Sequence, residues 1–388
     1  MQRLRHSFVV FGIVAIALTG CGSSRGKANA AAIEEVPLGA RTRPAVVAVG
    51  DRLVVYGGMT PGGRKTEALD DGAVFDGATG VWEKIRPSPT DPLYLPAAVP
   101  SGDGKVLVVG TGCKVDQNPT GDIPACAPGG LEAALLDPVS RRWEQVVPPP
   151  LSLGGRLLTA APLGEIDGGP AFLFNDVAWQ WGTQERAWRK LPSPAMNARR
   201  TCFAGGSVVA VGYDDRSSAR DLVAPAPGET RSNTQPSTAR PASLEAEVFT
   251  AGAWQAVSRP PTAPEAPAVM GLVCAGPDVL AYPAETGKNR PFGFRFDVAT
   301  RAWSQAKTPP DGVSVEQLSA WTGKEILIWT ASGPFLYSPS GDAWRHVGSA
   351  GLEQPEQIIW FANQALLVYR DSGAGDLRIA SFQPGEPK

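Results

Sequence analysis

A tryptophan motif that recurs six times limits most strongly what this chain can fold into. In each copy a short apolar run ends in a turn of small and polar residues, and a tryptophan follows that turn. Spacings between successive copies range from 41 to 66 residues, and the tryptophans are Trp82, Trp143, Trp188, Trp254, Trp303 and Trp344. Self-similarity with a period of roughly 40–50 residues indicates an array of small structural units that pack on one another.

Each tryptophan belongs to a unit of four strand-like runs. In the first unit these runs are 45–49, 53–56, 72–75 and 81–85, with glycine or aspartate between them. Short apolar runs separated by such residues predict β-strands joined by turns. The 44 glycines and 37 prolines favour the same interpretation, because they suit many turns and short strands better than long helices.

Four-stranded units at this period are typical of β-propeller blades. The pattern resembles the kelch repeat and the central propeller of galactose oxidase, and the resemblance covers residues 33–382. It implies an all-β fold, a single kelch-like propeller followed by a tail at 383–388. The repeats are degenerate, since only the first unit carries the double glycine, Gly57-Gly58. We expect the tryptophans to fill the space between blades; a sugar-stacking platform is the alternative.

The number of blades depends on how the two ends of the chain are interpreted. The last unit has runs at 358–361, 365–369 and 377–382, but no tryptophan strand follows. Residues 33–38 resemble the segment after each tryptophan, and we expect them to supply the missing outer strand. Seven blades then form a closed ring without a bare sheet edge. A six-bladed ring with an unpaired tail is the alternative.

The N-terminus has the pattern of an export signal. A basic start precedes an apolar run at 8–18, which is too short to cross a bilayer but fits a signal-peptide core. The sequence Leu18-Thr19-Gly20-Cys21 resembles the lipobox of bacterial lipoproteins. This resemblance implies cleavage before Cys21 and a diacylglycerol thioether on its sulfur. An ordinary secretory signal with a chance cysteine is the alternative.

We therefore predict a lipoprotein signal peptide at 1–20 and a lipidated cysteine with a flexible tether at 21–32. The partner of acylated Cys21 is the lipid bilayer, and the expected location is extracytoplasmic, anchored to the bacterial cell membrane. A second segment, 214–241, is rich in serine, arginine, proline and threonine. It is expected to be a disordered insert in the fourth blade, with a partner-binding segment as the alternative.

Four cysteines besides Cys21 predict disulfides in an exported chain. Cys113 and Cys126 flank a loop rich in glycine, proline, asparagine and aspartate, and we expect them to pair. Cys202 and Cys274 fall in the first strands of the fourth and fifth units, one register apart. Their side chains then point to opposite sheet faces, as two facing blades require. Two buried free thiols are the alternative for this second pair.

Charge and histidine content exclude several chemistries. The formal net charge is −2, without the basic excess that nucleic-acid binding needs. Only His6 and His346 are present, and cleavage before Cys21 would remove His6. Copper chemistry of the galactose oxidase type and histidine-based zinc sites are therefore not expected. We predict no cofactor and no metal, and no catalytic residue can be identified.

Propeller ligands usually bind over the central axis, where loops enter the first strand of each blade. Repeat alignment places six polar residues near this region: Arg43, Tyr94, Arg199, Arg200, Glu316 and Glu356. Arginines mixed with carboxylates suit an acidic sugar or a peptide, or acid/base catalysis. A solvated rim without a ligand is the alternative.

Two classes of function agree with these features. The first is a non-catalytic, membrane-anchored binding or scaffold module for an envelope protein or a glycan. The second is an envelope enzyme acting on glycans, such as a kelch-type epimerase or lyase. The sequence favours the first class, since no histidine-rich or paired-acid constellation is present. It does not identify the partner.

Overall fold

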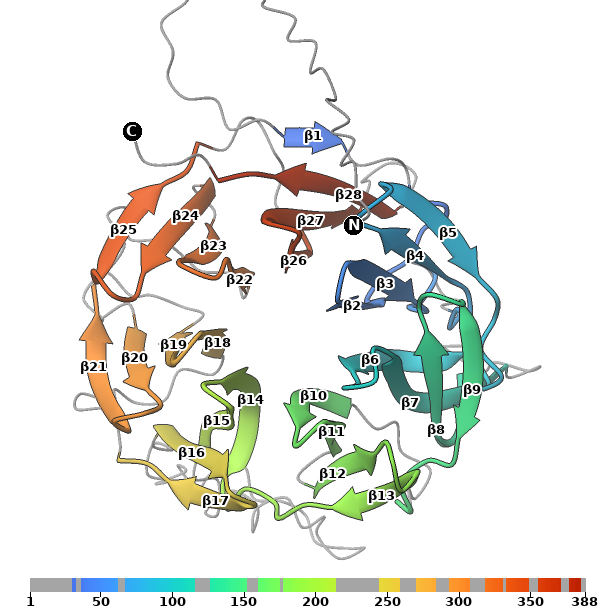
Figure 1. The fold of residues 1–388 in the computed structure, drawn as a ribbon, viewed down its shortest axis with the longest axis horizontal. Coiled ribbons are helices and arrows are strands. Elements are labelled where there is room, and N and C mark those ends of the chain that lie inside the picture. Colours follow the sequence, from blue (N-terminus) through green and yellow to red (C-terminus); the bar gives the residue numbers. More distant parts are fainter. Residues whose placement is uncertain are drawn as a thin grey trace, which may run out of the picture.

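Strands account for nearly all regular structure in the computed structural model (Figure 1). It describes residues 30–32, 36–61, 67–115, 126–151, 160–174, 177–213, 244–258, 270–283, 293–307, 318–330, 333–348, 355–370 and 377–384. These residues form seven four-stranded antiparallel sheets arranged around a common axis. The predicted all-β propeller with seven blades is confirmed, and the six-bladed alternative is wrong.

In each blade the first strand lies nearest the axis and the fourth lies at the rim. The first three blades are β2 (Ala45–Val49), β3 (Arg52–Tyr56), β4 (Gly72–Asp76), β5 (Val81–Ile85); β6 (Leu93–Pro100), β7 (Val106–Val115), β8 (Cys126–Asp137), β9 (Arg142–Val146); and β10 (Ala160–Ile166), β11 (Gly169–Phe174), β12 (Val177–Gly182), β13 (Ala187–Lys190).

The next three blades are β14 (Asn197–Ala204), β15 (Ser207–Tyr213), β16 (Leu244–Thr250), β17 (Ala253–Ala256); β18 (Met270–Ala275), β19 (Asp278–Pro283), β20 (Gly293–Asp297), β21 (Ala302–Ala306); and β22 (Ser319–Trp321), β23 (Ile326–Thr330), β24 (Gly333–Ser338), β25 (Ala343–His346). The seventh blade is β26 (Gln357–Phe361), β27 (Gln364–Arg370), β28 (Leu377–Phe382) and β1 (Ala30–Ala32).

The hydrophobic core is divided among the seven interfaces between neighbouring blades. Seven clusters of buried side chains are present, and each joins residues of two consecutive blades. Second strands are covered on both faces, and all five residues of β23 are buried. Such strands are therefore continuously apolar instead of alternating, which explains the valine and isoleucine runs in the sequence.

The six repeated tryptophans all occupy the second position of an outer strand. Four of them donate their indole N–H to a backbone carbonyl that follows the outer strand of the preceding blade. The Nε1–O distances are 2.7 Å for Trp143 to Arg86, Trp188 to Val147 and Trp254 to Pro192, and 2.6 Å for Trp344 to Lys307. The tryptophans are structural, as predicted, and these four also connect neighbouring blades through a hydrogen bond.

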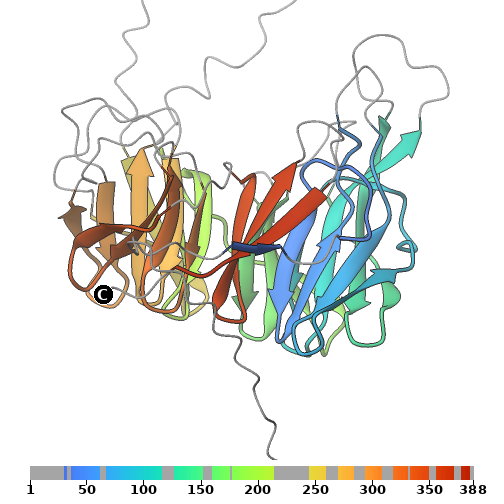
Figure 2. The same ribbon diagram turned by 90° about the horizontal axis from the view of Figure 1, so that it is seen from above.

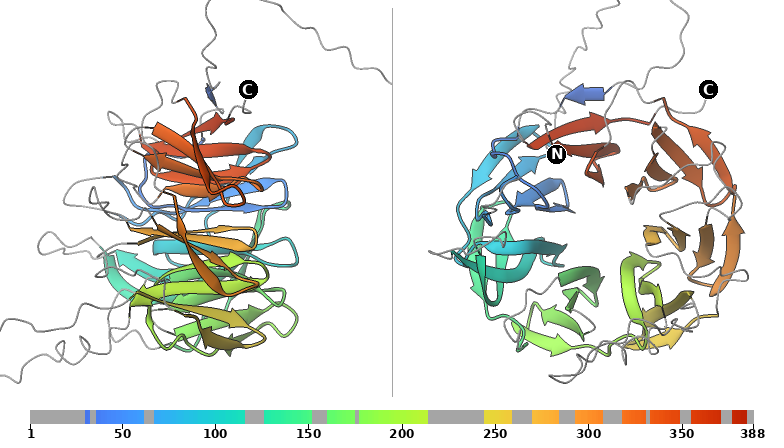
Figure 3. Two further views of the ribbon diagram at one scale, coloured as in Figure 1. Left: turned by 90° about the vertical axis from the view of Figure 1, so that its left-hand side faces the viewer. Right: turned by 180° about the vertical axis from the view of Figure 1, so that it is seen from behind.

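The N-terminal strand closes the ring, but it begins earlier than expected. β1 pairs antiparallel with β28, with Ala30 opposite Phe382 and Ala32 opposite Ala380 (Figures 1 and 3). The sequence predicted this strand at 33–38, within a propeller starting at 33. Instead, Val36 and Leu38 are buried between the seventh and first blades. Their apolar character therefore reflects packing, not strand pairing.

The disulfide between Cys202 and Cys274 is confirmed, with an S–S distance of 1.99 Å and Cα atoms 5.7 Å apart. It joins the innermost strands β14 and β18 of neighbouring blades. Cys113 is also disulfide-bonded; the side chain of its predicted partner, Cys126, lies outside the described residues. So do the signal peptide with Cys21 and the insert at 214–241. Across the described ranges, no helix has the length and apolar character needed to cross a membrane.

Candidate functional site

The predicted axial residues that the structure describes lie on different blades. Figure 2 shows the ring from the side, with the two faces that the strand ends form. Arg43 lies two residues before the innermost strand β2 and Glu356 one residue before β26, while Tyr94 and Arg200 lie within β6 and β14. Arg43, Arg200 and Glu356 are exposed, and Tyr94 is half-buried. Glu316 and the side chain of Arg199 lie outside the described residues. The four described residues are therefore spread around the ring and do not converge on one blade.

Beside them, the entry into the first blade is held by a buried arginine that the sequence pattern did not predict. Arg41 is 1% exposed. Its Nη1 donates to the carbonyl of Gly57 at 2.9 Å, and its Nη2 donates to Asp71 Oδ2 at 2.9 Å. Its Nε donates to the carbonyl of Gly39 at 3.1 Å. These contacts use the guanidinium for structure, so Arg41 is not free to bind a ligand.

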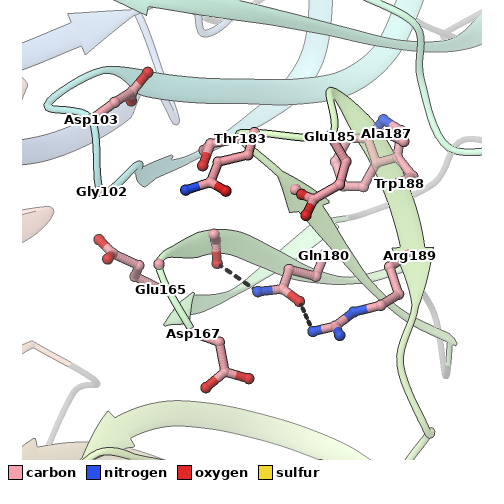
Figure 4. Close-up of a pocket in the computed structure, with 14 residues that line it drawn as sticks. Gly102, Asp103, Glu165, Asp167, Gln180, Thr183, Glu185, Ala187, Trp188 and Arg189 are labelled. Atoms are coloured by element: carbon pink, nitrogen blue, oxygen red, sulfur yellow. Dashed lines mark hydrogen bonds between the residues drawn. The ribbon is translucent and has the colours of Figure 1, made fainter.

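A polar pocket of about 890 Å³ lies at the opposite end of the strands. Figure 4 shows the residues that line it. Strands alternate in direction within a blade, so the turns after the first and third strands lie on the face away from the axial residues. The pocket is built from such turns. Gly102 and Asp103 come from the β6–β7 turn, Asp167 and Gly168 from the β10–β11 turn, and residues 182–185 from the β12–β13 turn.

Two glycines account for the space in the third blade. At the equivalent cross-strand positions the first blade carries Arg52 and Asp76, whose Nη1 and Oδ2 atoms are 2.9 Å apart. The corresponding positions of the third blade are Gly169 and Gly182, and both line the pocket. Replacing an ion pair with two residues that lack side chains leaves room at the end of this blade.

The floor of the pocket is a buried glutamine that holds an arginine. Gln180 is 4% exposed, and its Nε2 donates to the carbonyl of Ile166. Its Oε1 accepts a hydrogen bond from Arg189 Nη2 at 2.5 Å. Figure 4 shows the guanidinium pointing toward the Gln180 amide. The pocket therefore contains a fixed, partly satisfied cation beside a buried amide.

Arg189 points into the pocket because it lacks the ion pair that the equivalent residues of the first two blades form with the next blade. In the first two blades the residue after the tryptophan is a glutamate, which forms an ion pair with an arginine of the next blade, as Glu83 does with Arg141. Arg189 occupies this position in the third blade. The fourth blade presents Gly252 where the second blade presents Arg141. The fourth blade therefore has no charged side chain at this position to pair with Arg189, and Arg189 donates a hydrogen bond to Gln180 instead.

The pocket walls are predominantly acidic. Four carboxylates, from Asp103, Glu165, Asp167 and Glu185, line it together with the single guanidinium of Arg189. Burial tends to raise the pKa of Asp103, but the amide and ammonium of Lys105 help to hold that pKa below its usual range. Asp103 is therefore ionised at neutral pH. Such a lining attracts ammonium groups and accepts hydrogen bonds from hydroxyls.

The sequence did carry a signal for this pocket. In five units the turn before the tryptophan has the same length, and its first residue is Asp76, Asp137, Gly182, Asp297 or Ser338. The third unit alone has glycine there. Propeller ligands usually lie on the opposite face, so the ligand residues expected from the repeat are on that face, whereas this departure from the repeat marks the pocket.

Other chemistry is not assembled in the described part of the chain. Its histidine, cysteine, aspartate and glutamate side chains form no group of three or more that could hold a metal ion. His346 ends the outer strand β25, is exposed, and packs against Phe335 with ring centroids 4.9 Å apart. It is a surface residue, as expected from its position beside Trp344.

Comparison with known proteins identifies no family. No protein-family model matches the chain, and no curated protein matches it. Among solved structures, the chain is similar to the crystal structure of the tricorn protease, with a TM-score of 0.41 and 13% sequence identity. The match covers 85% of this chain but only 30% of that one. A likeness at this level carries no argument about function.

Proposed function

We propose that this protein is an exported bacterial lipoprotein with a kelch-like propeller that binds a polar ligand without transforming it. Acylated Cys21 holds the chain on the membrane, and the propeller lies on the extracytoplasmic side. The ligand is a hydroxyl- and amine-bearing molecule, such as a glycan that contains amino sugars.

Export and anchoring are supported by two independent features. The Leu18-Thr19-Gly20-Cys21 sequence resembles a lipobox, and the Cys202–Cys274 disulfide is of a kind that persists in oxidising compartments. Cys21 stands nine residues before Ala30, the first residue of β1. Nine residues span at most about 32 Å when fully extended. An acylated Cys21 would thus keep the rim of the seventh blade close to the membrane.

The pocket in the third blade is the observation that carries the binding part of the proposal. It combines a substantial volume, a buried amide, one oriented guanidinium and four carboxylates. Carboxylates and amides are suitable partners for sugar hydroxyls, and the acidic excess favours an amine. Asp103, whose pKa is lowered, is a poor proton donor at neutral pH, which favours binding over acid catalysis.

The test is a Gly182→Asn substitution, which matches in size the aspartate that the repeat carries elsewhere but adds no charge to the pocket. A Cβ at Gly182 would lie 2.5 Å from Glu185 Oε2, the end of a flexible side chain that can move aside. The new amide oxygen should cap its turn as Asp76 does, whose Oδ1 accepts the amide of Ala78 at 2.9 Å. Because the new side chain fills pocket space, we expect at least a tenfold loss of affinity for amine-bearing glycans, together with unchanged or higher thermal stability.

Binding is measured on arrays of neutral, acidic and amine-bearing glycans, and hits are followed by calorimetry. Ser338→Asn, at the same turn position in the sixth blade, is the matched control and should bind like the wild type. Equal affinity of the wild type and Gly182→Asn would rule out the pocket as the site. Chemical conversion of a bound glycan by the wild type would overturn the non-catalytic assignment.

A further inference from the structure

We infer that the outer rim of the first and second blades is a second membrane contact, which lies on anionic lipid headgroups. This inference rests on the proposed lipid anchor, and it adds an orientation that the anchor alone does not give. The surface consists of a basic groove between β5 and β9 together with three exposed valines on or next to these strands.

The groove has a volume of about 710 Å³ and is lined by four cations. Arg141 forms an ion pair with Glu83. Lys84, Arg86 and Arg142 are exposed, and none of them pairs with a carboxylate of the described residues. Three uncompensated positive charges therefore meet on one part of the rim, although the chain as a whole has a formal net charge of −2.

The frame beneath these charges is fixed by contacts between the two blades. Trp143 Nε1 donates to the carbonyl of Arg86 at 2.7 Å, and Arg141 reaches across to Glu83. Trp143 also packs edge-to-face on the buried ring of Tyr56, with centroids 4.9 Å apart. The cations thus lie on or directly next to adjoining outer strands that are linked to each other.

Exposed apolar side chains lie on or next to the same two outer strands. Four large hydrophobic residues are exposed in the described part of the chain, and three of them lie on or next to β5 and β9. These are Val81, Val139 and Val147, which are 47%, 68% and 79% exposed. Cations interspersed with protruding apolar side chains are typical of surfaces that lie in the headgroup region of a bilayer.

The position of the rim agrees with the anchor. β1 lies at the outer edge of the seventh blade, which adjoins the first blade and its outer strand β5 (Figure 1). Ala30 is nine positions after Cys21, which keeps the start of β1 within about 32 Å of the lipid. Attraction between the cations and anionic lipids acts over about one Debye length, roughly 8–10 Å. Docking by the rim leaves both faces of the ring, including the pocket of the third blade, open to solvent.

The test uses the full mature lipidated protein in vesicles, with an environment-sensitive fluorophore on a Val139→Cys substitution. The wild-type cysteines are acylated or expected in disulfides, so the new thiol is the only reactive one. Vesicles contain phosphatidylcholine alone or with 30% phosphatidylglycerol, and doxyl-labelled lipids quench a probe that enters the headgroups. Phe203→Cys is the matched control, because Phe203 is 44% exposed but lies on the innermost strand β14.

Quenching at position 139 is expected in the anionic vesicles, with little at position 203. Each basic residue near the surface changes the docked-to-undocked ratio about fivefold. Adding Arg86→Glu and Arg142→Glu should therefore lower that ratio at least about 25-fold, and 0.5 M salt should act in the same direction. The proposed docking surface would be contradicted by equal quenching at both positions. It would also be contradicted by quenching that changes neither with lipid charge nor with these substitutions. Failure of the anchor itself is distinguishable, since the protein would then not float with neutral vesicles.

Discussion

At the scale of the residue, an aspartate at the first turn position stabilises three of the hairpins that carry the tryptophan strands. Asp137 Oδ1 accepts the amides of Val139 and Ser140 at 2.9 and 3.1 Å, and its Oδ2 accepts the Ser140 hydroxyl at 2.7 Å. Asp76 and Asp297 accept turn amides in the same way. These bonds fix the turn because they satisfy backbone groups that have no strand partner.

The Asp137 turn should make a contribution to stability that depends on pH. The Ser140 hydroxyl bond, followed by the turn amides, lowers the pKa of Asp137 in the folded state. A carboxylate whose folded pKa lies below its unfolded value of about 3.9 stabilises fully above that pH, and the contribution is lost as pH falls through the folded pKa. Asp137→Ala should cost about 0.5–1 kcal/mol at pH 7. In thermal melts from pH 7 to pH 2, the gap to the wild type should shrink below about pH 4.

Asp137→Asn separates hydrogen bonding from titration. It keeps an oxygen acceptor for the turn amides but carries no ionisable proton, so its stability should lack this pH-dependent term. A gap between the wild type and Asp137→Ala that stays constant down to pH 2 would contradict the assignment.

At the scale of the element, the outer strand of each blade combines packing with a bond to its neighbour. Trp254 packs on Phe249 within its own blade, with centroids 5.3 Å apart, and donates to the carbonyl of Pro192 in the preceding blade. The indole is thus placed at a blade interface, where its ring is covered and its N–H meets a carbonyl. Trp303 packs on Phe296 in the same manner, but its buried Nε1 has no partner among the described residues.

This difference makes Trp254 and Trp303 a matched pair. Replacing either with phenylalanine shortens the ring system and removes the N–H, but only Trp254→Phe breaks a hydrogen bond between blades. Trp254→Phe should therefore be less stable than Trp303→Phe by about 0.5–1.5 kcal/mol in urea unfolding. Equal losses for the two variants would show that the N–H bond adds nothing to the packing of the ring.

The elements were predictable from the sequence where the repeat was periodic, and less so where single contacts decide the structure. The spacing of the tryptophans predicted the positions of the outer strands, because a tryptophan packs at the same position of the outer strand in six blades. The strand at the N-terminus was displaced, since Val36 and Leu38 are apolar for packing while the paired segment is Ala30–Ala32. Burial of Arg41 could not be foreseen, because its partners come from loop carbonyls and Asp71, with no repeat pattern.

At the scale of the whole molecule, the pairing of the N-terminal and C-terminal strands closes the ring of blades. Antiparallel pairing of β1 with β28 gives the seventh blade its fourth strand and joins the two ends of the chain. The Cys202–Cys274 disulfide adds a covalent link between two other blades, across 72 residues of sequence. In the chain-entropy model a link of that length stabilises by about 4 kcal/mol. The ring is thus secured at two separate places.

Deleting residues 30–32 should open the ring at the seventh blade. The loss of three paired residues and the exposure of the β28 edge should lower the free energy of unfolding by about 2–3 kcal/mol. Deletion of residues 26–28, which shortens the preceding segment by the same amount, is the control. Thermal melts of the two variants compare them directly, and equal melting temperatures would contradict closure by β1.

The central claim is that the same N-terminal segment anchors the protein in the membrane and closes its propeller. Mass spectrometry of the N-terminal peptide, from protein extracted out of bacterial membranes, tests it most directly. We predict that the mature chain begins at Cys21 and carries a diacylglyceryl group on that sulfur. A chain that retains residues 1–20, or one that begins elsewhere with an unmodified Cys21, would contradict it.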